Sequence, residues 1–140
     1  MRKIDKIILH CSATPEGKDY TVAQIDQWHR ARGFAGIGYH YVIDRYGKVH
    51  SGRSVEKAGA HCKGQNANSI GLCYIGGVAA DGKTPKDTRT AAQRETMKNF
   101  VLQLLKENPG ATVHGHYEYA AKACPSFDVA AWLKEIGIKQ

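Results

Sequence analysis

Two helix-start signals, with the apolar residues that follow them, constrain the fold more than any other feature of the sequence. Residues 21–24 read Thr-Val-Ala-Gln and residues 90–93 read Thr-Ala-Ala-Gln. A threonine three residues before a glutamine is a capping box, which opens an α-helix. Apolar residues at helical spacing predict a third helix near residue 129, and they are Val129, Trp132, Leu133 and Ile136. The sequence therefore predicts three helices, well separated along the chain.

Short apolar or β-branched segments alternate with these helices and predict a sheet. We expect strands at residues 4–9, 38–43, 49–52, 69–75 and 111–114. A turn at residues 44–48 joins the second and third strands into a hairpin. The order β-α-β-β-loop-β-α-β-α is typical of the α/β class, so we expect a single domain over residues 1–140, with a mixed central β-sheet flanked by about three helices.

Some side chains can be assigned an environment from the same patterns. Ile25, Trp28 and His29 fall on one face of the first helix, and Trp28 is expected to lie in the core. Cys73 lies within an apolar strand and is expected to be buried. Residues 54–68 are polar and contain glycine, which predicts a surface loop and a wall of any binding groove.

Composition restricts the partners and the compartment. The formal net charge of +7 favours anionic partners such as nucleic acid, acidic lipid or acidic wall polymers. The basic residues are scattered and no nucleic-acid motif is present, so we expect no specific nucleic-acid partner. No apolar run approaches the roughly 20 residues that cross a bilayer, and no signal-peptide pattern occurs, so we expect no membrane partner and a cytoplasmic protein as synthesised.

The four cysteines could form two disulfides, but a protein without a secretion signal is expected to keep them reduced. They are Cys11, Cys62, Cys73 and Cys124.

Residues 114–128 concentrate the candidate chemistry. This run contains two histidines, a lysine and a cysteine: His114, His116, Lys122 and Cys124. Neutral imidazole and thiolate are ligands that zinc prefers, but the paired cysteines of a structural zinc finger are missing. A further ligand from elsewhere in the chain is therefore expected, and His10, at the end of the first strand, is the candidate. Three protein ligands leave a fourth position open, which is typical of a catalytic zinc site.

Four blocks of sequence resemble a known family. They are residues 10–14 (His-Cys-Ser-Ala-Thr), 38–41 (Gly-Tyr-His-Tyr), 68–73 (Asn-Ser-Ile-Gly-Leu-Cys) and 122–128 (Lys-Ala-Cys-Pro-Ser-Phe-Asp). Together, in this order and spacing, they resemble the T7-lysozyme type of N-acetylmuramoyl-L-alanine amidase, in the amidase-2 family related to peptidoglycan-recognition proteins. Agreement of four blocks over almost the whole chain is far more specific than any single block.

The resemblance implies a hydrolase that cuts the amide bond between N-acetylmuramic acid and L-alanine of peptidoglycan, a bacteriolytic activity of phages and prophages. It implies Zn²⁺ bound by His10, His116 and Cys124, with Tyr39 and Lys122 as catalytic residues. Lys122 would stabilise the negative oxygen of the transition state. Tyr39 would form a hydrogen bond with the zinc-bound water or the substrate carbonyl, and could relay a proton. Such an enzyme would act on the cell wall, after release or assisted export. A monomer is the default expectation, because the sequence carries no signal for the oligomeric state.

The tail departs from the family pattern in one place. Tyr117 follows His116 where the family has a histidine, and His114 could compete with His116 as a ligand because alternate residues of a strand point the same way. Alignment through Glu118 and Lys122 favours His116. Glu118 is a candidate to orient a ligand histidine through a hydrogen bond.

Two other functions remain open from the sequence. One is a peptidoglycan-binding module without catalysis, although the complete set of Tyr39, Lys122 and Cys124 disfavours it. The other is a basic nucleic-acid-binding or polymerase-regulating domain, suggested by the charge of +7, which would bind with strong salt dependence.

Overall fold

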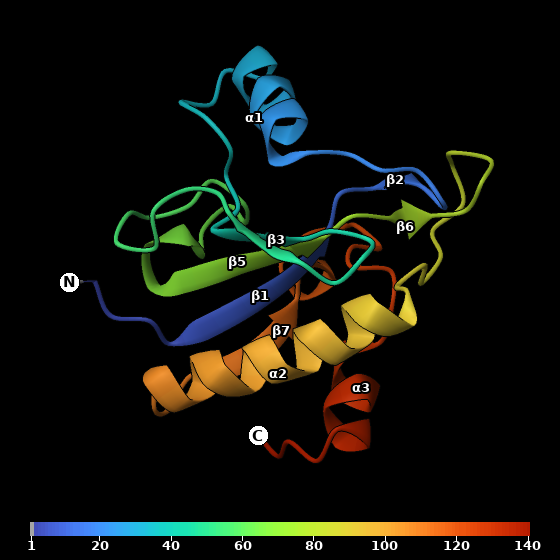
Figure 1. The fold of residues 1–140 in the computed structure, drawn as a ribbon. Coiled ribbons are helices and arrows are strands. Elements are labelled where there is room, and N and C mark those ends of the chain that lie inside the picture. Colours follow the sequence, from blue (N-terminus) through green and yellow to red (C-terminus); the bar gives the residue numbers. More distant parts are fainter. Residues whose placement is uncertain (1) are drawn as a thin grey trace.

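The computed structural model describes residues 2–140. Its elements, shown in Figure 1, are β1 (Lys6–Cys11), β2 (Thr14–Pro15), α1 (Val22–Ala31), β3 (Tyr41–Ile43), β4 (Val49–Ser51), the 3₁₀ turn η1 (Asn66–Asn68), β5 (Ser69–Tyr74), β6 (Gly77–Val78), α2 (Ala91–Glu107), β7 (Thr112–Gly115), the 3₁₀ turn η2 (His116–Glu118) and α3 (Val129–Glu135).

Five strands form the main sheet, in the order β4-β3-β5-β1-β7. The pairs β3–β5, β5–β1 and β1–β7 are parallel, and β4 runs antiparallel to β3. The sheet is therefore mixed, and the carboxyl ends of β1, β5 and β7 meet at one edge. His10 is paired in register with Cys73, one residue before the end of β1. Ligand sites of α/β proteins gather at such an edge.

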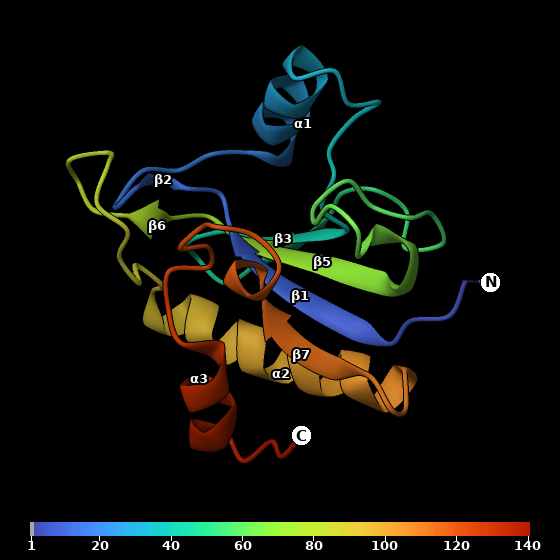
Figure 2. The ribbon, with the colours of Figure 1, turned by 180° about the vertical axis from the view of Figure 1, so that it is seen from behind.

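The two faces of the sheet are covered differently. Helices α2 and α3 cover one face, and α1 lies over the other, as Figures 1 and 2 show from opposite sides. Along β1, Ile7 and Leu9 pack with the α2 and α3 side chains in the larger core cluster. Alternate residues point to opposite faces, so Ile8 and His10 point toward the α1 side. The expected α/β fold with a mixed central sheet and three helices is confirmed.

Each helix begins where the sequence predicts. Thr21 and Thr90 form complete capping boxes with Gln24 and Gln93. The side chain of Asp128 accepts a hydrogen bond from the backbone N–H of Ala131 and caps α3. These caps satisfy backbone donors that a helix start leaves free.

The environment predicted for Trp28 is wrong, because its side chain is 39% exposed. Helix α1 buries only the narrow face that carries Ile25 and His29, and the Trp28 ring packs edge-on against Tyr20. The short parallel pair of β2 and β6 was not predicted. Strand β3 starts only at Tyr41, which leaves Tyr39 in the segment that leads into it.

Within residues 2–140, no helix has both the length and the apolar character needed to cross a membrane. The four cysteines are free.

Candidate metal centre

Three side chains from distant parts of the chain converge at the carboxyl edge of the sheet. His10 comes from β1, His116 begins η2 directly after β7, and Cys124 lies in the segment between η2 and α3. Their ligand atoms all lie within 4.8 Å of one another, and they form the group of described residues that could hold a metal ion. The short segment from β7 to α3 is fastened to β1 here, because the backbone N–H of Cys11 donates to Cys124 Sγ at 3.2 Å.

The electrostatic environment keeps both imidazoles neutral. Burial lowers the pKa of His10 well below its usual value, and the neighbouring His61, His116 and Lys122 lower it further. The pKa of His116 is lowered by burial and then by the charge of Lys122. Neutral imidazoles have a free lone pair, which is the form that binds a metal. The hydrogen bond with the Cys11 thiol, together with burial, raises the pKa of the Cys124 thiol, so binding of a cation there would release a proton.

The two ring nitrogens of His10 have different neighbours. Nδ1 lies 3.8 Å from Cys124 Sγ, whereas Nε2 lies 2.8 Å from Nδ1 of His61. The His10 and His116 rings are 4.6 Å apart between centroids. Nδ1 is therefore the nitrogen of His10 that faces the Cys124 thiol.

A cleft of about 490 Å³ opens beside these donors. His116, Tyr39 and Lys122 all line it. The Tyr39 ring packs against His10, with 5.1 Å between centroids. Burial, followed by the nearby cysteines, raises the pKa of Tyr39 well above its usual value. The Tyr39 hydroxyl therefore keeps its proton at neutral pH.

The loop at residues 54–68 forms a wall of this cleft, as expected, through residues 60–64 and Asn66. His29 lines the cleft as well and accepts a hydrogen bond from the backbone N–H of Gly38 at 2.8 Å. Its role on α1 is thus to hold the segment that carries Tyr39.

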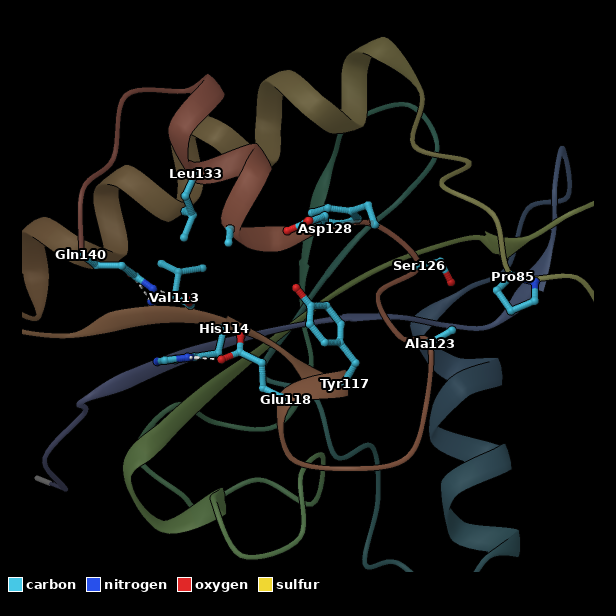
Figure 3. Close-up of a pocket in the computed structure, with 12 residues that line it drawn as sticks. Pro85, Val113, His114, Tyr117, Glu118, Ala123, Ser126, Asp128, Leu133 and Gln140 are labelled. Atoms are coloured by element: carbon cyan, nitrogen blue, oxygen red, sulfur yellow. Dashed lines mark hydrogen bonds and ion pairs between the residues drawn. The ribbon is translucent and has the colours of Figure 1, made fainter.

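His114 is engaged away from the donor group. Its Nδ1 lies 3.0 Å from Glu118 Oε1 and its Nε2 2.6 Å from Thr112 Oγ1. Figure 3 shows this pair at the edge of a second cavity, of about 690 Å³. None of His10, Tyr39, His116, Lys122 and Cys124 lines that cavity.

Among the described residues, Glu118 is hydrogen-bonded to neither His10 nor His116, so it does not orient either of them in the way that the sequence suggested. Its carboxylate contacts His114 and accepts a hydrogen bond from the backbone N–H of Gly115.

The family model for N-acetylmuramoyl-L-alanine amidase matches residues 1–127. The chain belongs to the N-acetylmuramoyl-L-alanine amidase family. It is 42% identical over 131 residues to the endolysin of Escherichia phage T7, a match that spans 94% of this chain and 86% of that protein. It is 30% identical to a peptidoglycan-recognition protein of Drosophila melanogaster, over 92% of this chain and 72% of that protein.

Solved structures share the fold of this amidase. The endolysin amidase LysCS of Clostridium intestinale superposes with a TM-score of 0.84, at 23% identity, covering 99% of this chain and 86% of that one. Wild-type PGRP-LB of Drosophila superposes with a TM-score of 0.78, at 22% identity, over 96% and 81% of the two chains.

The expected function is therefore confirmed: the amidase is a hydrolase of the amide bond between N-acetylmuramic acid and L-alanine in peptidoglycan. All three members of the possible metal-binding group are residues that the sequence predicted as ligands. His61 was not predicted, because its contact with His10 joins residues 51 positions apart. The only local signal for His61 was its place in a glycine-containing loop.

Proposed function

We propose that residues 1–140 form one zinc amidase domain in which His10, His116 and Cys124 bind Zn²⁺ and in which Tyr39 and Lys122 are the catalytic residues. The observation that carries this proposal is the convergence of two neutral imidazoles and one thiol beside a cleft lined by Tyr39 and Lys122.

The donor geometry fits zinc. Tetrahedral zinc, with Zn–S near 2.3 Å and Zn–N near 2.0 Å, separates a sulfur ligand from a nitrogen ligand by about 3.6 Å. Cys124 Sγ and His10 Nδ1 are 3.8 Å apart. Two nitrogens and one thiolate are a donor set that zinc prefers over magnesium or calcium, which take oxygen ligands.

When bound, zinc would supply a Lewis acid and lower the pKa of a water molecule toward about 7. Lys122 is exposed at the cleft, and its charge reaches both His10 and His116. It would stabilise the negative oxygen that develops as the amide carbonyl is attacked. Tyr39 keeps its proton and would donate a hydrogen bond to that carbonyl, or pass the proton toward the leaving nitrogen.

The charge of the cleft suits peptidoglycan as the partner. Arg32, Lys63 and Lys122 line it, and none of the acidic residues among positions 2–140 does. Peptide stems of the cell wall carry carboxylates, so these cations would attract the substrate. The net charge of +7 adds to this attraction for an anionic wall polymer. We propose that the protein acts at the cell wall, and that it does so as a monomer.

Mass spectrometry of muropeptides incubated with the protein tests this function. We expect free peptides that begin with L-alanine, loss of these products with a zinc chelator, and their return when zinc is added. Intact muropeptides in the presence of zinc-loaded protein would favour a binding module that lacks catalysis. Cleavage that is insensitive to a chelator, with protein shown to be metal-free, would exclude the zinc mechanism.

A further inference from the structure

His61 is buried in the wall of the cleft and contacts a proposed zinc ligand. Its side chain is 7% exposed, and its Nδ1 lies 2.8 Å from Nε2 of His10, with the two rings perpendicular. We propose that His61 is a positioning residue that fixes the tautomer and orientation of His10, and thereby sets the affinity for zinc. This inference rests on the proposed zinc site.

The direction of the hydrogen bond follows from which nitrogen faces the metal donors. His10 Nδ1 faces Cys124 Sγ, so its lone pair must be free to bind a cation. A neutral imidazole then carries its proton on Nε2. His10 Nε2 therefore donates to His61 Nδ1, and His61 must be the acceptor.

A second hydrogen bond holds His61 in the matching tautomer. Its Nε2 lies 3.1 Å from Oγ of Ser69, which is fully buried at the start of β5. With Nδ1 accepting, the His61 proton resides on Nε2 and is donated to Ser69. The three side chains thus form a hydrogen-bonded chain in which His10 donates to His61 and His61 donates to Ser69.

Reversal of this chain would be incompatible with metal binding. If Ser69 donated to His61, then His61 Nδ1 would carry the proton and donate to His10 Nε2. The proton of His10 would then lie on Nδ1, where it would block the lone pair that faces Cys124. Loss of the His61 side chain would leave the Nε2–H of His10 without an acceptor in a site where His10 is 1% exposed.

The protein has a slot that fits the His61 ring. A Cβ at Gly71 would lie 2.6 Å from His61 Cγ, and a Cβ at Gly59 would lie 2.5 Å from His61 Cδ2. Either contact is too short for any side chain, so glycine at both positions leaves room for the imidazole. Asn66 Oδ1 accepts the backbone N–H groups of His61 and Cys62 and fixes the loop that carries the ring.

Zinc affinity, measured by competition with a chromogenic chelator, tests this role in three variants. His61→Leu removes the acceptor, and we expect zinc to bind about 10- to 100-fold more weakly. In His61→Asn, the side-chain oxygen can take the place of Nδ1, and we expect most of the affinity to return. His50→Ala is the matched control, because His50 is a partly exposed histidine of β4 that pairs with Asp44.

Each outcome has a separate meaning. Equal zinc affinity of His61→Leu and the wild type would overturn the role of His61 while leaving the zinc site intact. A wild-type protein that binds no zinc would overturn the proposed function and this inference together. Equal losses of zinc affinity in His61→Leu and His61→Asn would also contradict the role of His61 as an acceptor, because asparagine keeps an acceptor oxygen.

Nitrogen-15 NMR of the zinc-loaded wild type does not depend on whether any variant folds. We expect His10 to be protonated on Nε2 and His61 to be protonated on Nε2 but not on Nδ1. Protonation of His61 on Nδ1, or zinc bound to Nε2 of His10, would contradict the inference.

Discussion

At the scale of single residues, the site contains two groups of side chains. One group would hold the metal, and the other would act on the substrate. Cys124 belongs to the first group. The backbone N–H of Cys11, at the end of β1, donates a hydrogen bond to its sulfur and holds it against that strand. Lys122, two residues earlier, is exposed at the cleft and belongs to the second group. Because the two roles are separate, substitutions should separate zinc binding from turnover.

Removal of the thiol tests the first role. In Cys124→Ala we expect the loss of most bound zinc and of all measurable amidase activity, because the site keeps only two of three protein ligands. Metal analysis of the purified protein, alongside muropeptide cleavage, measures both effects. The matched control is Cys73→Ala, which removes a buried thiol that is not a donor and should retain zinc. Full zinc content in Cys124→Ala would rule out the assigned ligand.

Removal of the lysine tests the second role. We expect Lys122→Ala to bind zinc normally and to lose about 100- to 1,000-fold in kcat, the usual effect of removing one group that stabilises an oxyanion. Lys86→Ala is the control, since Lys86 is an exposed lysine paired with Glu16. Zinc loss in Lys122→Ala would show that the lysine supports the metal site instead.

At the scale of elements, parallel pairing assembles the site. Because β1 and β7 run parallel side by side, His10 near the end of β1 and His116 just beyond β7 arrive at the same edge. Helix α2 packs on the face of the sheet opposite to the one toward which His10 points, where Thr90 caps it and also donates to the carbonyl of Arg45. Its contribution to stability should therefore be independent of zinc binding.

The cap of α2 provides the test. We expect Thr90→Ala to lower the free energy of unfolding by about 1 to 2 kcal/mol, because it removes the N-cap acceptor of Gln93 N–H and the bond to Arg45. Urea unfolding measures the change, and Thr90→Ser, which keeps a hydroxyl, should retain most of the stability. Altered zinc affinity in the folded Thr90→Ala protein would contradict the independence of the two faces.

The elements also show which features the sequence could predict. The start of a helix depends on four consecutive residues, so both capping boxes could be predicted. The β2–β6 pair could not, since two-residue strands carry no periodicity. The environment of Trp28 depends on how much of α1 the sheet covers, which is set by packing between distant segments. The role of His61 is set by the same kind of long-range packing.

At the scale of the whole molecule, the two faces of the sheet differ in polarity. The α2 and α3 face holds the larger apolar cluster, whereas buried histidines gather on the side of the cleft, including His10, His40 and His61. Neighbouring rings are in contact, with 4.9 Å between the centroids of His10 and His61 and 5.7 Å between those of His40 and His61. A fold that buries neutral imidazoles must lose stability in acid.

His40 gives this acid sensitivity a defined pH window. Burial lowers its pKa to about 4, and its Nδ1 accepts the backbone N–H of Gly71 at 3.0 Å. Because the unfolded chain has a histidine pKa near 6.5, the neutral side chain favours the fold above that pH. The contribution is lost as pH falls from about 6.5 toward 4, with a slope of at most about 1.4 kcal/mol per pH unit.

Urea unfolding of the metal-free protein between pH 7.5 and 4.5 measures this dependence. We expect His40→Gln to be less stable at pH 7.5 but to lose stability less steeply in acid than the wild type. Parallel pH profiles of the two proteins would show that His40 does not contribute.

X-ray absorption at the zinc edge of the wild-type protein tests the central claim most directly, since it reports the donor atoms themselves. The proposed site predicts one sulfur at about 2.3 Å and nitrogen or oxygen ligands at about 2.0 Å, four ligands in total. In Cys124→Ala, the sulfur contribution should disappear from any zinc that remains. A wild-type spectrum without sulfur, or with two or more sulfur ligands, would contradict a centre formed by His10, His116 and Cys124.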